Sequence, residues 1–426
     1  MLDRNKAPEI HEIEAVTLQI AEVTHLSNGA KLHYIKSETQ PVIRLDFVFK
    51  AGKWYEPQSG VSDLAAKMLF EGTLNYSAKQ IAEIVAFYGA SFENNQGYDR
   101  TEFTLYCLSK YVPELLPLVL DVIQNPTFPE EEYNLLKKRN QQNLKVQRQK
   151  NSYLATHSFT KLVYGEKHPY IFGLDENGLD SITKEELINF YKSRFSTKNL
   201  EVFACGSIDD PTQMLLEREI EMLALTSDIS EESRELLLGN KSYAFVDMPE
   251  SLQSSIRIGK QFPTIHHDDY HKLVVLNEIL GGYFGSRLMR NIREDKGYTY
   301  GIFSAISPKE HDSLFYIGTD VNYQVTNNTI EEVKKEIKIL QSEEVPEDEL
   351  QIVKNYMLGK FINDIATIFE QCDRYKRIVL QGLPMEHYNN YITTIRGVTS
   401  KEIKELAQQY LNIEQLKIAV AGKKSD

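Results

Sequence analysis

The sequence predicts an α+β protein, a tandem duplication of two homologous α/β lobes, each a mixed, mostly antiparallel sheet packed by helices. Its length of 426 residues exceeds what one ordinary hydrophobic core supports. Residues 182–206 align without gaps on residues 398–422, and both copies read as a capped helix, a short turn, a buried strand and a glycine. Two related lobes usually leave a cleft between them, so the lobes are expected to enclose one.

The first half begins with strands and continues mainly with helices. Residues 15–50 have strand periodicity, and Leu-Ser-Asn-Gly at 26–29 marks a hairpin turn. The next apolar residues have the i, i+3, i+4, i+7, i+8 spacing of a buried helical face, namely Val61, Leu64, Ala65, Met68 and Leu69. Further expected elements are helices near 78–89, 110–124 and 130–150, a capping box at 183–186 with its helix, and a strand at 199–206.

An acidic segment at 207–238 predicts a helix followed by a linker, and it places the lobes at 1–225 and 226–426. The second half repeats the mixture of strands and helices. Its expected elements are strands at 243–246, 255–259, 298–306 and 312–321, helices at 268–280, 329–341, 347–369 and 372–380, and a final capped helix and strand within 399–422.

Composition excludes several classes of protein. The net charge of −13 disfavours nucleic acid or an anionic membrane as a partner. No apolar run reaches the roughly 20 residues of a membrane span, and no signal segment is recognisable, so a cytoplasmic location is expected. The dispersed Cys107, Cys205 and Cys372 predict neither a disulfide framework nor a metal site, and the first two are expected to be core thiols.

Residues 281–302 combine a glycine-rich turn, a short helix, a helix stop and a strand. Phe284, Leu288 and Ile292 recur at i, i+4 and i+8, which predicts one apolar helical face. Gly297 suits the left-handed residue that closes a helix, and alternation over 298–303 predicts a strand.

Two polar side chains, Arg293 and Tyr300, lie on either side of this corner. A guanidinium can bind a carbonyl or carboxylate through two hydrogen bonds, and a phenol can donate a hydrogen bond to a developing oxyanion. The spacing alone favours a plainer interpretation, in which the pair is a surface arginine and a half-buried tyrosine.

The helix near residue 61 carries Asp63, Ala66 and Lys67 on the face opposite its apolar residues. Two histidines and a glutamate at these positions would form a zinc site with a general base. A cationic lysine repels a metal ion, so Asp63 and Lys67 are interpreted as an i, i+4 ion pair and no metal is expected on this chain.

Residues that match the motifs of one known protein family occur in a fixed order over nearly the whole chain. In the first half they are Asn28-Gly29, Phe49-Lys-Ala-Gly52, Glu56, Gly60, Met68-Leu-Phe-Glu-Gly-Thr73, Gly89-Ala90, Pro126, Phe128, Glu130-Glu-Glu132, His168-Pro-Tyr170 and Phe190-Tyr191. In the second half they are Asn277, Leu280-Gly-Gly282, Ser286-Arg-Leu288, Arg293-Glu294, Lys296-Gly297 and Tyr300. In this order the chain resembles the insulinase/pitrilysin-type zinc peptidases, in their short form similar to the subunits of mitochondrial processing peptidase.

The resemblance places the family's HxxEH zinc motif on Asp63, Ala66 and Lys67, and its third ligand, a glutamate, within the non-acidic segment 141–145. It places the family's substrate-holding arginine and tyrosine on Arg293 and Tyr300, which favours the functional interpretation of that pair. Family members include heterodimers in which one subunit carries zinc and the other carries this pair. The resemblance therefore implies a non-zinc subunit, inactive alone, that acts on peptides together with a homologous zinc-bearing subunit. When isolated, such a subunit could pair with a second copy of itself.

Other interpretations stay open at this point. A structural or peptide-binding homologue could have kept the fold and lost proteolysis, and a self-sufficient metallopeptidase with an unusual site is the least favoured. His267 and His271 could bind a metal if helical, although a polar helix start explains them more simply. His168 is expected to form hydrogen bonds in a loop.

Overall fold

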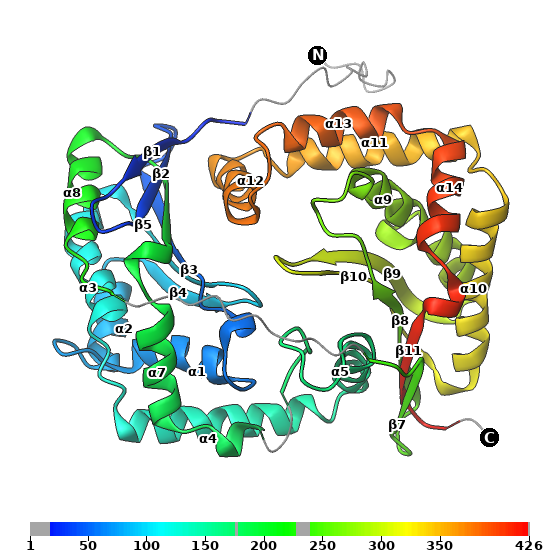
Figure 1. The fold of residues 1–426 in the computed structure, drawn as a ribbon, viewed down its shortest axis with the longest axis horizontal. Helices are drawn as coiled ribbons and strands as arrows, with labels where there is room; N and C mark the ends of the chain where they lie inside the picture. Colours follow the sequence, from blue (N-terminus) through cyan, green and yellow to red (C-terminus); the bar gives the residue numbers. More distant parts are fainter. Residues whose placement is uncertain (1–17, 175–177, 227–238, 425–426) are drawn as a thin grey trace, which may run out of the picture.

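The structure is a computed structural model that describes residues 18–174, 178–226 and 239–424. Two sheets face each other across the molecule, and most helices cover their outer faces (Figure 1). This arrangement confirms the predicted two-lobed α+β fold. The acidic stretch 227–233 that we predicted as a linker lies outside the described residues. None of the described helices is long and apolar enough to cross a bilayer.

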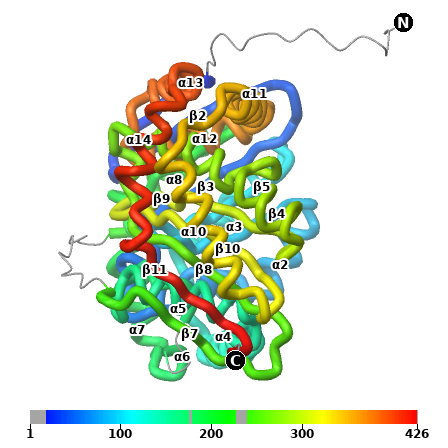
Figure 2. Tube along the Cα trace, turned by 90° about the vertical axis from the view of Figure 1, so that its right-hand side faces the viewer, coloured from blue at the N-terminus to red at the C-terminus, as the bar shows by residue number. Residues whose placement is uncertain are grey.

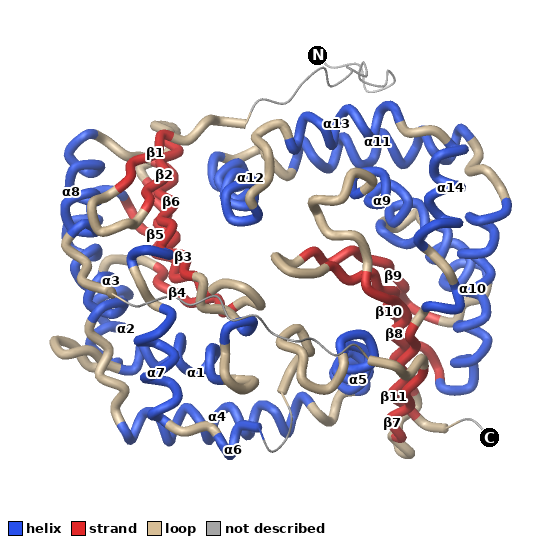
Figure 3. Tube along the Cα trace, viewed as in Figure 1, coloured by secondary structure: helices blue, strands red, loops and turns tan. Residues whose placement is uncertain are grey.

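The N-terminal sheet has the strand order β1-β2-β6-β3-β5-β4, and only β2 and β6 pair in parallel. Its strands are β1 (Glu22–His25), β2 (Lys31–Lys36), β3 (Val42–Phe49), β4 (Ser91–Gln96), β5 (Thr101–Leu108) and β6 (Leu200–Gly206). The helices α1 (Val61–Met68), α2 (Ala78–Phe87), α3 (Val112–Gln124), α4 (Glu130–Gln147), α6 (Gly178–Ser181), α7 (Lys184–Arg194) and α8 (Asp210–Glu221) belong to the same half of the chain (Figure 3). The five residues predicted for the apolar face of α1 and its extension are all buried.

The C-terminal sheet has the order β7-β11-β8-β10-β9, again with one parallel pair, β7 with β11. Its strands are β7 (Tyr243–Asp247), β8 (Gln253–Gln261), β9 (Thr299–Pro308), β10 (Ser313–Asn322) and β11 (Lys417–Gly422). Its half contributes α9 (Tyr270–Asn277), α10 (Thr326–Ser342), α11 (Glu347–Asn363), α12 (Ile368–Gln381), α13 (His387–Gly397) and α14 (Ser400–Tyr410). The duplicated segments are α7–β6 and α14–β11, and both helices begin with the predicted capping box, at Thr183 and Thr399.

Each sheet is covered on its inner face by a helix from the other half of the chain. The helix α5 (Asn151–Tyr164) packs against β7, β8 and β11, where Phe159 and Tyr164 join a buried cluster with Leu314. The helix α12 packs against β6, where Cys372 and Tyr375 join a buried cluster of the N-terminal sheet. In this sense the two halves of the chain exchange one helix each. Figures 1 and 2 show α5 and α12 beside the sheets that they cover.

The structure corrects several helix bounds. The single helix expected over 130–150 ends at Gln147, and α5 begins at Asn151. The break was not predicted because residues 148–150 contain no glycine or proline to mark it. The helix expected over 347–369 ends at Asn363, because Thr367 forms a capping box that starts α12. The helix α13 was not predicted from the sequence. Cys107 and Cys205 are core thiols as predicted, and Cys372 is also buried.

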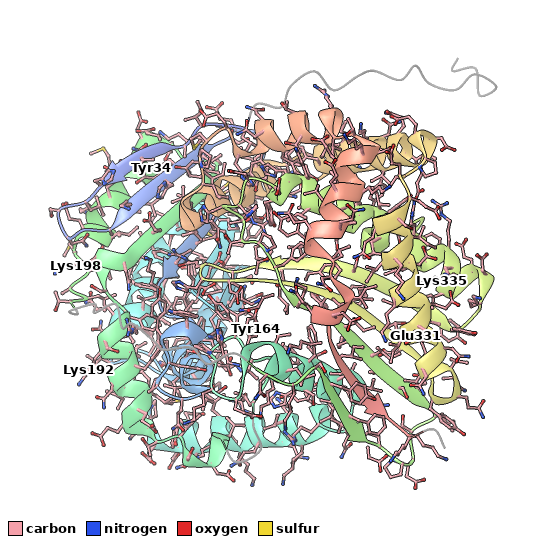
Figure 4. The ribbon with its side chains drawn as sticks, turned by 45° about the vertical axis from the view of Figure 1, so that its right-hand side comes forward. Tyr34, Tyr164, Lys192, Lys198, Glu331 and Lys335 are labelled. Atoms are coloured by element: carbon pink, nitrogen blue, oxygen red, sulfur yellow. The ribbon has the colours of Figure 1, made fainter. Side chains whose placement is uncertain are left out.

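The β9–β10 hairpin of the C-terminal lobe makes a third connection between the lobes. At its tip, Glu310 forms an ion pair with Arg100, and the ring of His311 stacks on Trp54 with 4.0 Å between centroids. The Lys309 ammonium lies 5.1–5.7 Å from three ring centroids, those of Tyr98, Tyr164 and Tyr170. Tyr164 lies near the middle of the molecule in Figure 4. These contacts set the positions of the two lobes relative to each other.

Candidate functional site

The N-terminal lobe presents α1 with an unusual cap. Gly60 precedes the helix with a φ of 105° and offers no side-chain oxygen. The carboxylate of Glu56 replaces that cap, because its Oε2 accepts hydrogen bonds from Gly60 N at 3.1 Å, Ser62 N at 3.1 Å and Ser62 Oγ at 2.7 Å. Burial raises the pKa of Glu56 to about 6, although the hydrogen bonds from Ser62 and the charge of Lys53 oppose that rise.

On the same helix, Lys67 Nζ lies 2.7 Å from Asp63 Oδ2, the i, i+4 ion pair predicted from the sequence. Lys67 Nζ also donates a 3.4 Å hydrogen bond to Asn140 Oδ1 on α4, one residue before the segment 141–145. Ala66 was predicted to share a face with Asp63 and Lys67 opposite the apolar residues, but it is fully buried. The reason is that α1 packs against both α7 and α4, which leaves only part of this face open.

This constellation does not fit a zinc ion. The donor set at the motif positions is one carboxylate, one methyl group and one ammonium, and the neighbouring side chain from α4 is an amide. An ammonium donates hydrogen bonds and supplies no lone pair to a metal. Within the residues that the structure describes, no three His, Cys, Asp or Glu side chains come together as a metal-holding group.

A pocket of about 320 Å³ lies beside the degenerate motif. Its lining includes Asp63, Ser62 and Gln96, and Gln96 Nε2 donates a 2.8 Å hydrogen bond to Ser62 Oγ. Gln96 ends β4, which is the last strand of its sheet and therefore has one free edge. A free strand edge can pair with an extended peptide through main-chain hydrogen bonds.

The segment that carries Arg293 has wide, π-helical turns over Glu278–Gly282 and Met289–Asp295. Gly297 closes the second turn with a φ of 66°, as predicted. Leu288 and Ile292 are fully buried, but Phe284, predicted to share their face, is 65% exposed. The prediction for Phe284 was wrong because residues 283–286 form a turn, and the helix begins only after it.

The exposed ring of Phe284 supports Arg293. The Cζ atom of Arg293 lies 4.5 Å from the centroid of that ring, which is a cation–π distance. Arg293 NH1 is also 4.0 Å from Glu294 Oε1, and the arginine side chain is 34% exposed. The guanidinium therefore rests against the ring of Phe284, and within the described residues its N–H groups form no hydrogen bond. The spacing of Phe284 predicted a core position, so its contact with Arg293 could not be foreseen from the sequence.

Tyr300 projects from a bulge in β9. Ile302 pairs with Thr319 and Thr299 with Val321, so Tyr300 and Gly301 together face one residue of β10. The hydroxyl of Thr319 donates to Gly301 O at 3.0 Å and helps to hold the bulge. Tyr300 is 95% exposed, not half-buried, and β9 is the last strand of its sheet. Within the described chain, no hydrogen bond joins Tyr300 to Arg293.

The two groups of candidate residues are not brought together. Tyr300 lies eight residues along β9 from Pro308, next to the hairpin tip that contacts the N-terminal lobe. A strand rises about 3.3 Å per residue, so Tyr300 is displaced from that contact by roughly 25 Å. Within the described residues, no hydrogen bond or ion pair joins Arg293 or Tyr300 to Asp63 or Lys67.

Comparisons with known proteins match both halves of the chain. A family model described as "Insulinase (Peptidase family M16)" matches residues 31–168, and one described as "Peptidase M16 inactive domain" matches residues 181–357. An "uncharacterized zinc protease" of Rickettsia felis is 25% identical over 88% of this chain and 92% of its own length. A "non-peptidase homolog YmxG" of Helicobacter pylori is 25% identical over 96% of both chains.

Solved structures share the fold. A crystal structure of a peptidase M16 inactive domain from Pseudomonas fluorescens has a TM-score of 0.87 and 23% identity, and covers 95% of this chain and 98% of that one. A protease from Helicobacter pylori has a TM-score of 0.85 and 18% identity, and covers 95% and 100%. The names of the relatives include both proteases and a non-peptidase, so the residues at the site carry the functional argument.

Proposed function

Because this chain belongs to the insulinase family of peptidases, peptidase family M16, we propose that it is the non-zinc subunit of a heterodimeric, zinc-dependent peptidase. In this proposal a homologous subunit with an intact HxxEH motif holds the zinc ion and carries out hydrolysis. The present chain contributes Arg293 and Tyr300 to the peptide enclosed between the two subunits. It has no activity alone, since Lys67 occupies a ligand position.

The observation that carries the proposal is the exposure of Tyr300. Its phenol is 95% exposed on a bulged edge strand, while the neighbouring Arg293 is oriented on the ring of Phe284. An exposed phenol beside an oriented guanidinium contributes little to the stability of its own lobe. Both groups are available to a molecule that approaches the edge of β9, which supports a role toward a substrate presented from outside this chain.

The chemistry assigned to the pair is electrophilic. The Arg293 guanidinium donates hydrogen bonds to a substrate carbonyl and positions the peptide. The Tyr300 phenol donates a hydrogen bond to the oxygen on which negative charge develops when the carbonyl is attacked. A donor of this kind typically stabilises a transition state by about 2.7–4 kcal/mol, equivalent to roughly 10²–10³ in rate.

The test uses the full chain mixed with a zinc-bearing homologue that carries HxxEH. Neither the chain alone nor the Tyr300→Phe mixture should cleave a fluorogenic peptide efficiently, and Tyr300→Phe should lower kcat by roughly 10²-fold or more without changing complex formation. Tyr243→Phe, at another exposed tyrosine on β7, is the matched control and should leave kcat unchanged. Full activity of the Tyr300→Phe mixture would refute the catalytic role.

A second candidate function is a peptide-binding homologue without catalysis. The free edge of β4 and the adjoining pocket of about 320 Å³ favour it, because they offer main-chain pairing without a hydrolytic group. In that case the chain alone binds an extended peptide in a fluorescence anisotropy titration. No zinc-bearing homologue then yields turnover that depends on Tyr300.

A further inference from the structure

A cavity of about 210 Å³ lies inside the C-terminal lobe, between α9, α11, α12 and α13. In Figure 1, α9, α11 and α13 lie in the upper right part of the view, and α12 lies nearer the middle, toward the N-terminal sheet. The cavity is distinct from the Arg293–Tyr300 pair and from the pocket beside α1, because it shares no lining residue with either. Its walls are partly aromatic, with Tyr270, Phe361 and Tyr391 among the lining residues.

Three buried polar atoms that belong to lining residues lack a protein partner in the described chain. They are Glu278 Oε1, His271 Nδ1 and the hydroxyl oxygen of Tyr388. Glu278 is 8% exposed and Tyr388 is 7% exposed. Buried polar groups in folded proteins are almost always hydrogen-bonded, so three atoms without a partner on residues that line one cavity mark this part of the lobe as unusual.

The backbone is shaped to place the carboxylate of Glu278 there. Glu278 begins the π-helical turn Glu278–Gly282, and such wide turns occur frequently at functional sites. A Cβ atom on Gly282 would lie 2.3 Å from Glu278 Oε2, so a larger residue at position 282 would require the carboxylate to move. Burial raises the pKa of Glu278, and the charge of Lys360 opposes that rise.

Charges of the opposite sign line the cavity as well. Lys360 on α11 and Arg377 on α12 are exposed, and within the described residues neither side chain makes a hydrogen bond or an ion pair. Arg374 is already engaged, because its NH2 lies 2.8 Å from Asp364 Oδ2. Burial, followed by the charges of His271 and Arg377, lowers the pKa of His387 to about 4, so its imidazole is neutral at neutral pH.

A buried acceptor that carries negative charge, two unpaired cations and aromatic walls are together the chemistry that recognises a zwitterion with an apolar side chain. We propose that this cavity binds a free α-amino acid with an aromatic or large aliphatic side chain. Glu278 accepts hydrogen bonds from its ammonium group, and Lys360 and Arg377 hold its carboxylate. The side chain packs against the aromatic wall.

Ordered water is the alternative occupant, because the cavity has room for roughly seven molecules at about 30 Å³ each. Water would hydrate the polar groups that face the cavity. It would not explain why two cations without ion-pair partners and a buried carboxylate line the same small cavity. A metal ion is also disfavoured, since Glu278, His271 and His387 do not come together as a metal-holding group in the described chain.

The test is isothermal titration of the full chain with L-phenylalanine and L-leucine. We expect saturable binding of one equivalent of each amino acid. Binding should be weaker by roughly tenfold or more for N-acetyl-L-phenylalanine, which lacks the ammonium group, and for L-phenylalaninamide, which lacks the carboxylate. Glu278→Gln should weaken binding by a similar factor. The matched control is Asp121→Asn, which alters another buried carboxylate, one that is hydrogen-bonded to Thr73 and Asn75 in the other lobe, and it should bind normally.

A stability measurement separates a binding role from a structural one. Glu278→Leu should unfold at the same or a higher temperature than the unliganded parent, because it removes an unpartnered buried carboxylate, whereas Asp121→Asn should unfold at a lower temperature. The proposal is overturned if no probe binds at millimolar concentration, if Glu278→Gln binds like the parent, or if Glu278→Leu is as destabilised as Asp121→Asn. It does not depend on the proposed peptidase role.

Discussion

The attachment of α12 to the N-terminal sheet depends on one buried lysine, and we predict that Lys376→Met loosens it strongly. Lys376 Nζ donates to Asp46 Oδ2 at 2.9 Å and to Glu102 Oε1 at 2.5 Å. The Asp46 side chain is 1% exposed and the Lys376 side chain 14% exposed, so this pair is shielded from solvent. Burial alone would lower the pKa of Lys376, but Asp46 and Glu102 outweigh it and raise that pKa.

The expected magnitude follows from what remains after the substitution. Removing one partner of a buried ion pair costs about 3–5 kcal/mol, because the other charge is left buried. Arg44 Nε stays 3.1 Å from Asp46 Oδ2, so the Asp46 carboxylate keeps a positively charged neighbour. The Glu102 side chain is 21% exposed, so its carboxylate keeps some contact with solvent. We therefore expect the free energy of unfolding to fall by about 3 kcal/mol, the lower end of that range.

The assay is urea unfolding followed by circular dichroism at pH 7. The matched control is Lys401→Met, at an exposed ion pair with Glu405, which should change the midpoint very little. Adding Glu102→Gln to Lys376→Met should recover part of the loss, since one uncompensated carboxylate is removed. A loss below about 1 kcal/mol for Lys376→Met, or equal losses for the two lysines, would refute the argument that this network is energetically buried.

Three further predictions concern the candidate sites and their supports. Burial raises the pKa of Glu56 from 4.5 to about 6, so the folded chain holds that proton more tightly than the unfolded chain does. Stability therefore falls as the pH rises through this window, by about 2 kcal/mol in total once the pH is well above 6, and Glu56→Gln should abolish this slope in thermal melts. Phe284→Ala should leave the melting temperature unchanged, because the ring is 65% exposed, yet lower kcat/KM of the assembled complex about two- to fivefold through the lost cation–π contact with Arg293, and unchanged kinetics would contradict that support. Gly297→Ala should cost about 1 kcal/mol of unfolding free energy because its φ is 66°, whereas Gly397→Ala, at a helical glycine without positive φ and with open space around it, should cost nothing in the same denaturation assay.

Short-range patterns predicted the local elements well. The capping boxes at Thr183 and Thr399, the left-handed Gly297 and the ion pair of Asp63 with Lys67 are all formed as expected. Each of them involves residues within four positions of one another. Their geometry follows from the helix itself, and it needs no information about the rest of the chain.

Errors arose where a neighbouring element decides the outcome. Ala66 was placed on the face opposite the apolar residues, but it is buried because α7 and α4 pack against α1. Phe284 matched the spacing of a helical face, but a turn precedes that helix and leaves the ring exposed under Arg293. The orphaned carboxylate of Glu278 gave no signal in the sequence, because an acidic residue in a helix is usually exposed.

By itself, the sequence determined the duplicated α+β lobes, their strands and capped helices, and the absence of a ligand set at positions 63, 66 and 67. Only the tertiary structure decided which sheet each inner helix covers, that Tyr300 stands exposed about 25 Å along its strand from the hairpin tip, and that a polar cavity opens behind Glu278. The physical reason is the separation along the chain of the residues that interact. Hydrophobic periodicity and capping report on neighbours within one or two helical turns, whereas the exchange of α5 and α12 joins residues that lie more than one hundred positions apart.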